Sequence, residues 1–137
     1  MAAAYRFAQV STRCDNSLMF TQALLDHFKN PRNAGELADA NVRVTVSNPV
    51  CGDILELAVR IDAGVVCEIR FLCRGCTASI ACASVLTEMI QGRELRGLEA
   101  ITSESLAASL GGLPPASFHA ATLAYDALQH LRRAAAS

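Results

Sequence analysis

The sequence has no tryptophan, only 5% aromatic residues and four prolines. A surface that stacks on nucleic-acid bases needs aromatic side chains among basic ones, and the basic residues here are scattered without such interleaving. The net charge of −1 gives no strong field towards a polyanion or an anionic membrane. No uncharged apolar run approaches the ~18 residues that a bilayer-spanning helix needs. We therefore expect neither nucleic acid nor a membrane among the partners.

What the chain does contain is a high share of apolar residues and a notable number of cysteines. Apolar residues make up 52% of 137 positions, enough for one compact domain with its own core. There are six cysteines, but the N-terminus carries no long apolar segment ending in a small-residue cleavage site, as a secreted disulfide scaffold would. We therefore predict a cytoplasmic protein whose thiols are reduced. In that compartment, clustered cysteines are metal ligands or reactive thiols more often than bridges.

The first 18 residues, Met1 to Leu18, are predicted to form a flexible extension, followed by a domain over residues 19–134. The opening stretch MAAAYRFAQVSTR has arginines and no acidic residue, so a transit peptide for organellar import is the alternative interpretation. Cys14 lies in this extension and is expected to be an incidental thiol.

The first half of the domain is predicted to be a helix followed by three strands. Apolar residues at helical spacing predict a helix over Phe20 to Lys29, which Pro31 should end. Apolar and polar residues then alternate over 42–47, 53–61 and 65–73. This period of two, with one polar face, is typical of an antiparallel sheet covered on one side. Cys67 is expected to share the core face of the third strand.

The second half is predicted to be helical, over 77–91, 102–110 and 117–133. Gly92 and the Gly111-Gly112 pair follow two of these helices, where glycine commonly ends a helix. The order of strands first and helices afterwards indicates an α+β domain. We expect a three-stranded antiparallel sheet with the helices packed on one face.

Candidate ligands stand in three loops, at points where strands or helices begin or end. They are Cys51 and Asp53 in the turn NPVCGD, Cys76 at the start of the helix over 77–91, and His119 at the start of the last helix. Thiolate, imidazole and carboxylate together form a ligand set for zinc, or for iron with sulfide. Cys76 should also be a ready thiolate, because the N-terminus of a helix stabilises negative charge.

Each of these residues also has a structural interpretation. A single buried cysteine is usually a small hydrophobic residue, a histidine at a helix start can bond to backbone, and an aspartate can simply open a strand. Cys73 and Cys76 form a CxxC pair, a spacing that zinc sites and redox motifs use, so Cys73 is a possible substitute ligand. Spacing alone leaves the structural and metal-binding interpretations open.

Taken together, four segments resemble the NifU/IscU family of iron–sulfur scaffold proteins. They are LLDHFKNPRNAG, NPVCGD, FLCRGCTASIACASVLTEMIQGREL and LGGLPPASFHAATLAYDAL, and the likeness runs from Phe20 to about Arg133. The spacing from Cys76 to His119 is similar to that of the IscU and NifU branch of the family. The related SufU proteins carry an insertion in this interval. The resemblance implies the same fold, a three-stranded sheet with helices on one face.

The resemblance also implies a function. In this family a cysteine desulfurase delivers sulfur, iron enters, and a labile [2Fe–2S] cluster assembles before transfer to an acceptor protein. By resemblance, Cys51 and Cys76 are cluster ligands, Asp53 is the nearby carboxylate, His119 is the adjacent imidazole, and Cys76 is the candidate sulfur acceptor. Such a scaffold is not an enzyme, so no catalytic residue is expected.

The chain departs from the family pattern in two places. The third ligand cysteine should directly follow His119, where this chain has Ala120, which offers no ligand atom. The Leu-Pro-Pro segment that some members present to an Hsp70-type chaperone is followed by Ala116 and Ser117 instead of Val and Lys, so we do not predict that interaction.

Two alternatives to an active scaffold follow. The first is a degenerate module of the same fold that holds zinc or regulates the desulfurase without building clusters. The reason to consider it is Ala120, which stands in place of the third ligand cysteine. The second is an enzyme with Cys76 as nucleophile and His119 as base. No oxyanion or substrate-pocket pattern in the sequence favours the enzyme.

Overall fold

The computed structural model describes residues 20–49 and 52–136. The extension predicted over residues 1–18, including Cys14, lies outside the described residues, and so does Cys51. In chain order the elements are α3 (Gln22–Lys29), β1 (Val42–Ser47), β2 (Ile54–Asp62), β3 (Val65–Arg74), α4 (Thr77–Ile90), η2 (Leu95–Ala100), α5 (Ser103–Ser109), η3 (Pro115–Ser117) and α6 (Phe118–Ala136). All the predicted helices and strands are present within the described residues, whereas the 3-10 segments η2 and η3 were not predicted.

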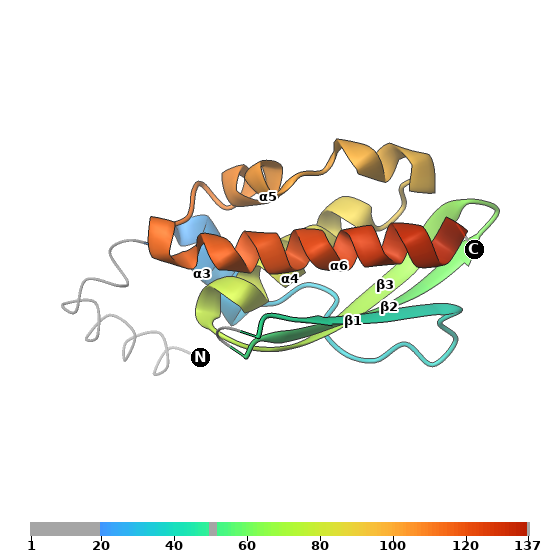
Figure 1. Cartoon of the computed structure of the whole chain (residues 1–137), viewed down its shortest axis with the longest axis horizontal. Coiled ribbons are helices and arrows are strands. Elements are labelled where there is room, and N and C mark those ends of the chain that lie inside the picture. The colour runs from blue at the N-terminus through green and yellow to red at the C-terminus, as the bar shows by residue number, and fades with distance from the viewer. Residues whose placement is uncertain (1–19, 50–51, 137) are drawn as a thin grey trace.

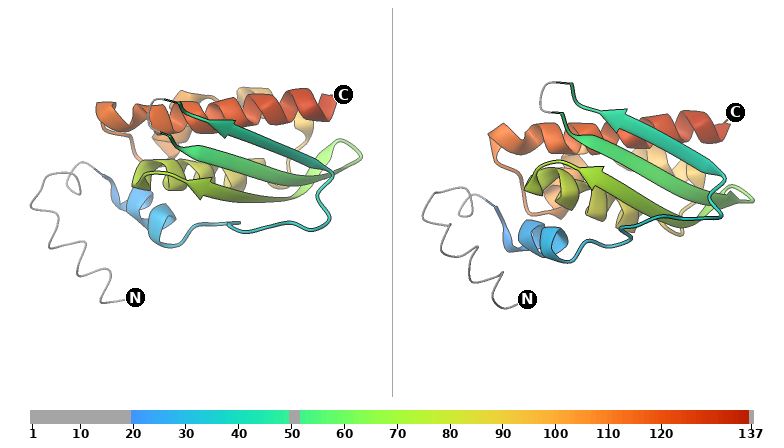
Figure 2. Two further views of the ribbon diagram at one scale, coloured as in Figure 1. Left: turned by 60° about the horizontal axis from the view of Figure 1, so that its bottom comes forward. Right: turned by 90° about the horizontal axis from the view of Figure 1, so that it is seen from below.

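The three strands form one antiparallel sheet in the order β1-β2-β3. Helix α6 packs against β1 and β2, and α4 packs against β3 and α6. Both helices cover the same face of the sheet, and α5 lies beyond them on the side away from the strands (Figure 1; Figure 2). The prediction of an α+β fold with helices on one face is therefore confirmed.

Alternation along β2 decides which face of the sheet is covered. Leu55, Leu57 and Val59 point towards the helices and are buried. Glu56 and Arg60 point the other way and pair with charged residues on the neighbouring strands. Burying the apolar side chains of one face stabilises the sheet by roughly 1.5–3 kcal/mol per large side chain. The opposite face carries these charged pairs together with the exposed side chains of Ile54 and Leu72.

The prediction that Cys67 lies in the core is wrong, because β3 contains a β-bulge. In the register, Arg60 pairs with Glu68 but the next residue, Ile61, pairs with Val66, so Cys67 has no partner on β2. An extra residue of this kind reverses the alternation on one side of the bulge. Val66 consequently enters the core and Cys67 is exposed.

Helix α4 is the centre of the domain. It contacts α3, β3, α5 and α6, and most of its side chains are buried. The small residues of TASIACAS allow these elements to approach from several sides. No helix in the described part of the chain is both long and apolar enough to cross a bilayer.

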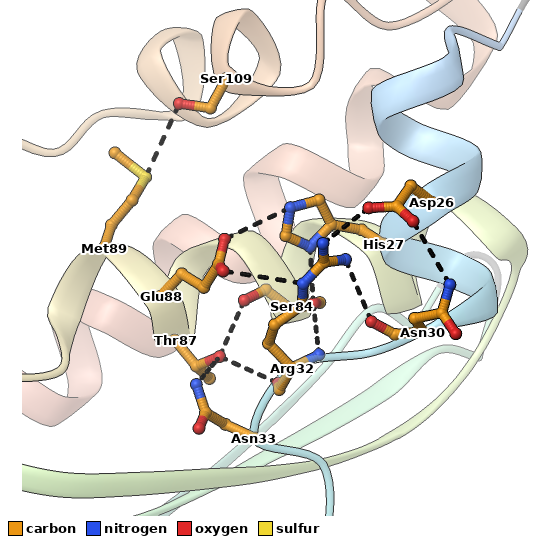
Figure 3. A network of polar contacts seen from close by, with 10 residues as sticks. All are labelled: Asp26, His27, Asn30, Arg32, Asn33, Ser84, Thr87, Glu88, Met89 and Ser109. Carbon is orange, nitrogen blue, oxygen red and sulfur yellow. Dashed lines mark hydrogen bonds and ion pairs between the residues drawn. The ribbon is translucent and has the colours of Figure 1, made fainter.

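A network of polar contacts fastens α3 and the segment after it to α4 (Figure 3). His27 lies 2.7 Å from Ser84 through its Nδ1 atom and 3.4 Å from Glu88 through Nε2. Ser84 Oγ accepts a hydrogen bond from the backbone N–H of Arg32, and the Arg32 guanidinium reaches both Glu88 and Asp26. These bonds hold residues that are far apart in the sequence.

The same segment covers the free edge of β3. The backbone N–H of Gly35 donates to the carbonyl of Phe71, and the N–H of Phe71 donates to the carbonyl of Asn33. An uncovered edge strand is a template for pairing with another chain. The network of Figure 3 therefore anchors the segment that protects this edge.

Candidate metal centre

Three loops meet at one end of the molecule and bring together three of the predicted ligands. Asp53 directly precedes β2, Cys76 caps the N-terminus of α4, and His119 lies in the first turn of α6. One ligand atom from each residue lies within 4.8 Å of the other two. Within the described ranges, this is the group of cysteine, histidine and carboxylate side chains with the spacing of a metal site.

Asp53 enters the site from a short turn whose backbone closes on itself. The N–H of Gly52 donates to the carbonyl of Asn48, and the N–H of Asn48 donates to the carbonyl of Asp53. Gly52 has φ +77°, a left-handed conformation in which glycine carries no steric penalty. The Asp53 side chain is only 8% exposed, so the carboxylate is directed inwards and not to solvent.

Gly75 is needed because the Asp53 carboxylate lies against its backbone. A Cβ atom at position 75 would stand 2.7 Å from Asp53 Cγ and 3.0 Å from both carboxylate oxygens. Contacts that short force the carboxylate or the loop to move. The glycine before Cys76 therefore makes room for an acidic group from another loop.

Cys76 presents its sulfur at the start of a long helix. It is the N-cap residue of α4, with φ −78° and ψ 173°, and it is exposed. The first N–H groups of a helix have no partner within the helix, and together with the helix dipole they favour a negative charge at this position. The predicted placement of Cys76 at a helix N-terminus is confirmed.

His119 is oriented by its own backbone. Its Nδ1 atom lies 3.1 Å from the carbonyl oxygen of Ala116, which can only accept a hydrogen bond. The neutral ring therefore carries its proton on Nδ1 and keeps the lone pair on Nε2. Nε2 lies 3.8 Å from Cys76 Sγ and 3.9 Å from Asp53 Oδ2. Histidines that bind a metal through one ring nitrogen commonly donate a hydrogen bond from the other, which fixes the orientation of the ring.

Ser79 also belongs to the site, although the sequence pattern did not predict it. Its hydroxyl donates to Asp53 Oδ2 over 2.5 Å, and its Oγ lies 3.3 Å from Cys76 Sγ. The available signal was a small polar residue one helical turn after a cysteine at a helix start. Small polar residues are frequent near helix starts, so this signal has little weight without the structure.

The other cysteines differ in how accessible they are to a metal. Cys73 is half-buried, and burial, with Asp53 and Cys76 nearby, raises the pKa of its thiol to about 12. Cys82 is fully buried, and burial raises the pKa of its thiol to about 12 as well. Neither belongs to the group that Asp53, Cys76 and His119 form. The substitute role of Cys73 therefore stays a prediction, as does the role of Cys51.

The residue at the position of the expected third cysteine is buried and has no ligand atom in this chain. Ala120 follows His119 on α6, is 1% exposed and is part of the hydrophobic core. The donors that the described site offers are therefore one sulfur, one imidazole nitrogen and one carboxylate oxygen, a set suited to zinc or to iron.

Comparisons with known sequences and structures identify the family of this chain. The sequence profile of the NifU-like N terminal domain matches residues 19–134. The iron-sulfur cluster assembly scaffold protein IscU 1 of Archaeoglobus fulgidus is 40% identical over 111 residues, which cover 81% of this chain and 72% of that protein. The iron-sulfur cluster assembly scaffold protein IscU of Aquifex aeolicus is 37% identical over 114 residues, which cover 82% of this chain and 73% of that protein.

A solved structure shares the fold. It is a putative iron-sulfur cluster assembly scaffold protein for the SUF system from Fervidobacterium islandicum, with a TM-score of 0.71. The match covers 85% of this chain and 98% of that one, at 18% sequence identity, and therefore concerns the fold alone. The profile match and the identity to the two relatives extend over most of the sequence, and the chain belongs to the NifU-like N terminal domain family.

Proposed function

We propose that this protein is a scaffold for iron–sulfur cluster assembly, which binds iron and sulfide as cargo and is not an enzyme. One observation carries the proposal: Asp53, Cys76 and His119 reach a common point from three separate loops, with ligand atoms within 4.8 Å of one another. Two relatives, 40% and 37% identical over 81% and 82% of this chain, are named iron-sulfur cluster assembly scaffold proteins.

In this proposal Cys76 receives sulfur from a cysteine desulfurase. Its exposed thiolate attacks the outer sulfur of a persulfide on the donor enzyme, a new S–S bond forms on Cys76, and the donor cysteine leaves as a thiolate. Release of that sulfur as sulfide takes two electrons, which an added dithiol supplies. The accessible position of Cys76 at a helix N-terminus suits this exchange, because only the thiolate is nucleophilic.

The complete ligand set in this proposal is Cys51, Asp53, Cys76 and His119. Two sulfurs, one nitrogen and one oxygen bind iron less tightly than a set with a third cysteine, because thiolates are the preferred ligands of iron–sulfur clusters. We therefore expect a labile [2Fe–2S] cluster that passes readily to an acceptor protein. Cys73 is the residue of this chain best placed in sequence to supply a further sulfur.

The test is cluster assembly from purified components without oxygen. The protein is mixed with ferrous iron, cysteine, a cysteine desulfurase and a dithiol, and iron and acid-labile sulfide are measured after desalting. We expect equal amounts of iron and sulfide and a visible absorption that is absent when the desulfurase is omitted. Iron without sulfide, or no visible chromophore, would contradict the scaffold function.

A second candidate function is zinc binding without cluster assembly, and the buried Ala120 is the observation that favours it. A tetrahedral site of two cysteines, one histidine and one aspartate would hold zinc well. Stoichiometric zinc in the purified protein, together with failed assembly, would favour this candidate.

Ala120→Cys separates the two candidates further. If a missing ligand limits cluster assembly, this variant should bind more iron and sulfide per chain than the wild-type protein. Since Ala120 is buried, the free energy of unfolding of the variant is measured alongside. An equally stable variant with an unchanged yield would show that the missing cysteine does not limit assembly.

A further inference from the structure

We propose that Ser79 is a positioning residue that holds the Asp53 carboxylate in the metal site. The proposal rests on the metal-binding function proposed above and adds to it a residue of α4 that does not itself bind the metal.

Ser79 is buried and contacts two of the candidate ligands. It lies one helical turn after Cys76 on α4 and is only 2% exposed. Its hydroxyl donates to Asp53 Oδ2 over 2.5 Å, and its Oγ lies 3.3 Å from Cys76 Sγ. A hydroxyl this buried cannot turn to bulk water, so its bonds within the protein fix its orientation.

The Ser79 hydroxyl has one proton, so it can donate a hydrogen bond to only one of these two neighbours. A carboxylate only accepts hydrogen bonds, so the hydroxyl proton of Ser79 points to Asp53. It follows that the thiol of Cys76, when protonated, is the donor towards Ser79 Oγ. The serine therefore links the oxygen ligand and the sulfur ligand through one atom.

Gly75 leaves space for the carboxylate in this orientation. The carboxyl carbon of Asp53 lies 2.7 Å from the position that a Cβ on residue 75 would take. The hydrogen bond from Ser79 holds Asp53 Oδ2, and this same atom lies 3.9 Å from His119 Nε2. A ligand already held in its binding orientation loses less conformational entropy when the metal enters.

Without the Ser79 hydroxyl, Asp53 would be free to leave this orientation. Residues that hydrogen-bond to metal ligands usually change metal affinity by about 10- to 100-fold when they are removed. We expect Ser79→Ala to weaken Co²⁺ binding by about tenfold. Ser79→Thr keeps the hydroxyl and should restore most of the affinity.

A matched control lies on the same helix. Ser84 is also buried, but its hydroxyl contacts His27 and the N–H of Arg32 and no candidate ligand (Figure 3). Ser84→Ala removes the same atom from the same helix. It should lower the stability of the fold and leave Co²⁺ affinity within about twofold of wild type, which separates positioning from a general loss of structure.

The experiment is a double-mutant cycle on the apo protein of full length. Ser79→Ala is made in the wild type and in Asp53→Ala, and Co²⁺ affinity is followed by the visible bands of the bound ion. A residue that acts through Asp53 should weaken binding about tenfold in the wild type and less than about twofold in Asp53→Ala. The shape of the Co²⁺ spectrum should change in Ser79→Ala and not in Ser84→Ala.

The same cycle is measured by urea unfolding without metal. Loss of a hydrogen bond to a charged group should lower the folding equilibrium constant about tenfold in the wild type and have little effect in Asp53→Ala. Equal effects of Ser79→Ala in both backgrounds, for binding or for unfolding, would overturn the proposal. A wild-type protein that binds no Co²⁺ would contradict the proposed function instead, and the unfolding cycle would still decide whether Ser79 holds Asp53.

Discussion

Two regions of the molecule combine a histidine, a serine and a carboxylate, and they use them differently. In the network between α3 and α4, His27 is 8% exposed and both of its ring nitrogens have partners, Ser84 and Glu88 (Figure 3). In the candidate metal centre, His119 uses Nδ1 for a backbone carbonyl, while Nε2 lies nearly 4 Å from both Cys76 and Asp53.

The difference lies in whether the polar atoms pair with one another or converge on one point. In the α3–α4 network, the polar atoms of one segment are matched by those of another, which stabilises the fold and protects the edge of β3. In the metal centre, sulfur, nitrogen and oxygen converge at distances too long for strong hydrogen bonds and suited to a shared ion. Residue type alone therefore does not distinguish a structural cluster from a binding one.

The largest effect is expected from Cys76→Ser. Oxygen replaces a thiolate ligand, so we expect at least a 100-fold loss of Co²⁺ or Zn²⁺ affinity, roughly the upper range for changes around a metal site. Because Cys76 is exposed, the free energy of unfolding of the apo protein should change by less than about 0.5 kcal/mol. Titration with metal and urea unfolding measure the two quantities.

Cys67→Ser is the matched control for that variant. Cys67 is also exposed, but it lies at the bulge of β3 and outside the ligand group. It should leave metal affinity unchanged. Equal losses in both variants would contradict the assignment of Cys76 as a ligand.

Gly75→Ala should have a smaller effect on the same site. The added Cβ would stand 2.7 Å from the carboxyl carbon of Asp53, so the carboxylate must move. We expect metal affinity to fall by about 10- to 100-fold. Gly97→Ala is the control, since a Cβ at position 97 meets no atom within 4 Å. If the two variants bind metal alike, the close approach of Asp53 to Gly75 does not matter for binding.

The smallest effect concerns the α3–α4 network and pH. Burial, and to a lesser degree Arg32, lowers the pKa of His27 below its usual value, although Glu88 and Asp26 oppose the shift. Below about pH 6.5 the unfolded chain therefore binds a proton at this residue more readily than the folded one. Stability should fall as the pH drops from 7 towards 5, by at most about 1.4 kcal/mol per pH unit from this residue.

His27→Asn tests that assignment. The variant should be less stable at pH 7.5 and should show a shallower fall in the free energy of unfolding towards pH 5 than the wild type. Urea unfolding at several pH values provides the comparison. An unchanged slope would mean that another group causes the pH dependence.

The sequence predicted the fold because its local patterns and its global arrangement agree. Alternation over the three strands gave the covered face, and glycines and caps placed the helices to within a few residues. The error at Cys67 has a physical cause: a bulge depends on how two strands pair, and the period of one strand does not contain that information.

The candidate site could be predicted only in part for a similar reason. Cys76 and His119 stand at helix starts that are visible in the sequence, whereas the 2.5 Å bond from Ser79 to Asp53 joins residues 26 positions apart. The bond between His27 and Ser84 spans 57 positions and gave no local signal at all. Such contacts depend on tertiary packing.

The most direct test of the account is X-ray absorption on the zinc-loaded protein, which counts the atoms around the metal by element and distance. If Cys51, Asp53, Cys76 and His119 hold the ion, the spectrum should show two sulfurs at about 2.3 Å and two nitrogen or oxygen atoms at about 2.0 Å. A shell of four sulfurs, or a shell with no sulfur, would contradict this ligand set.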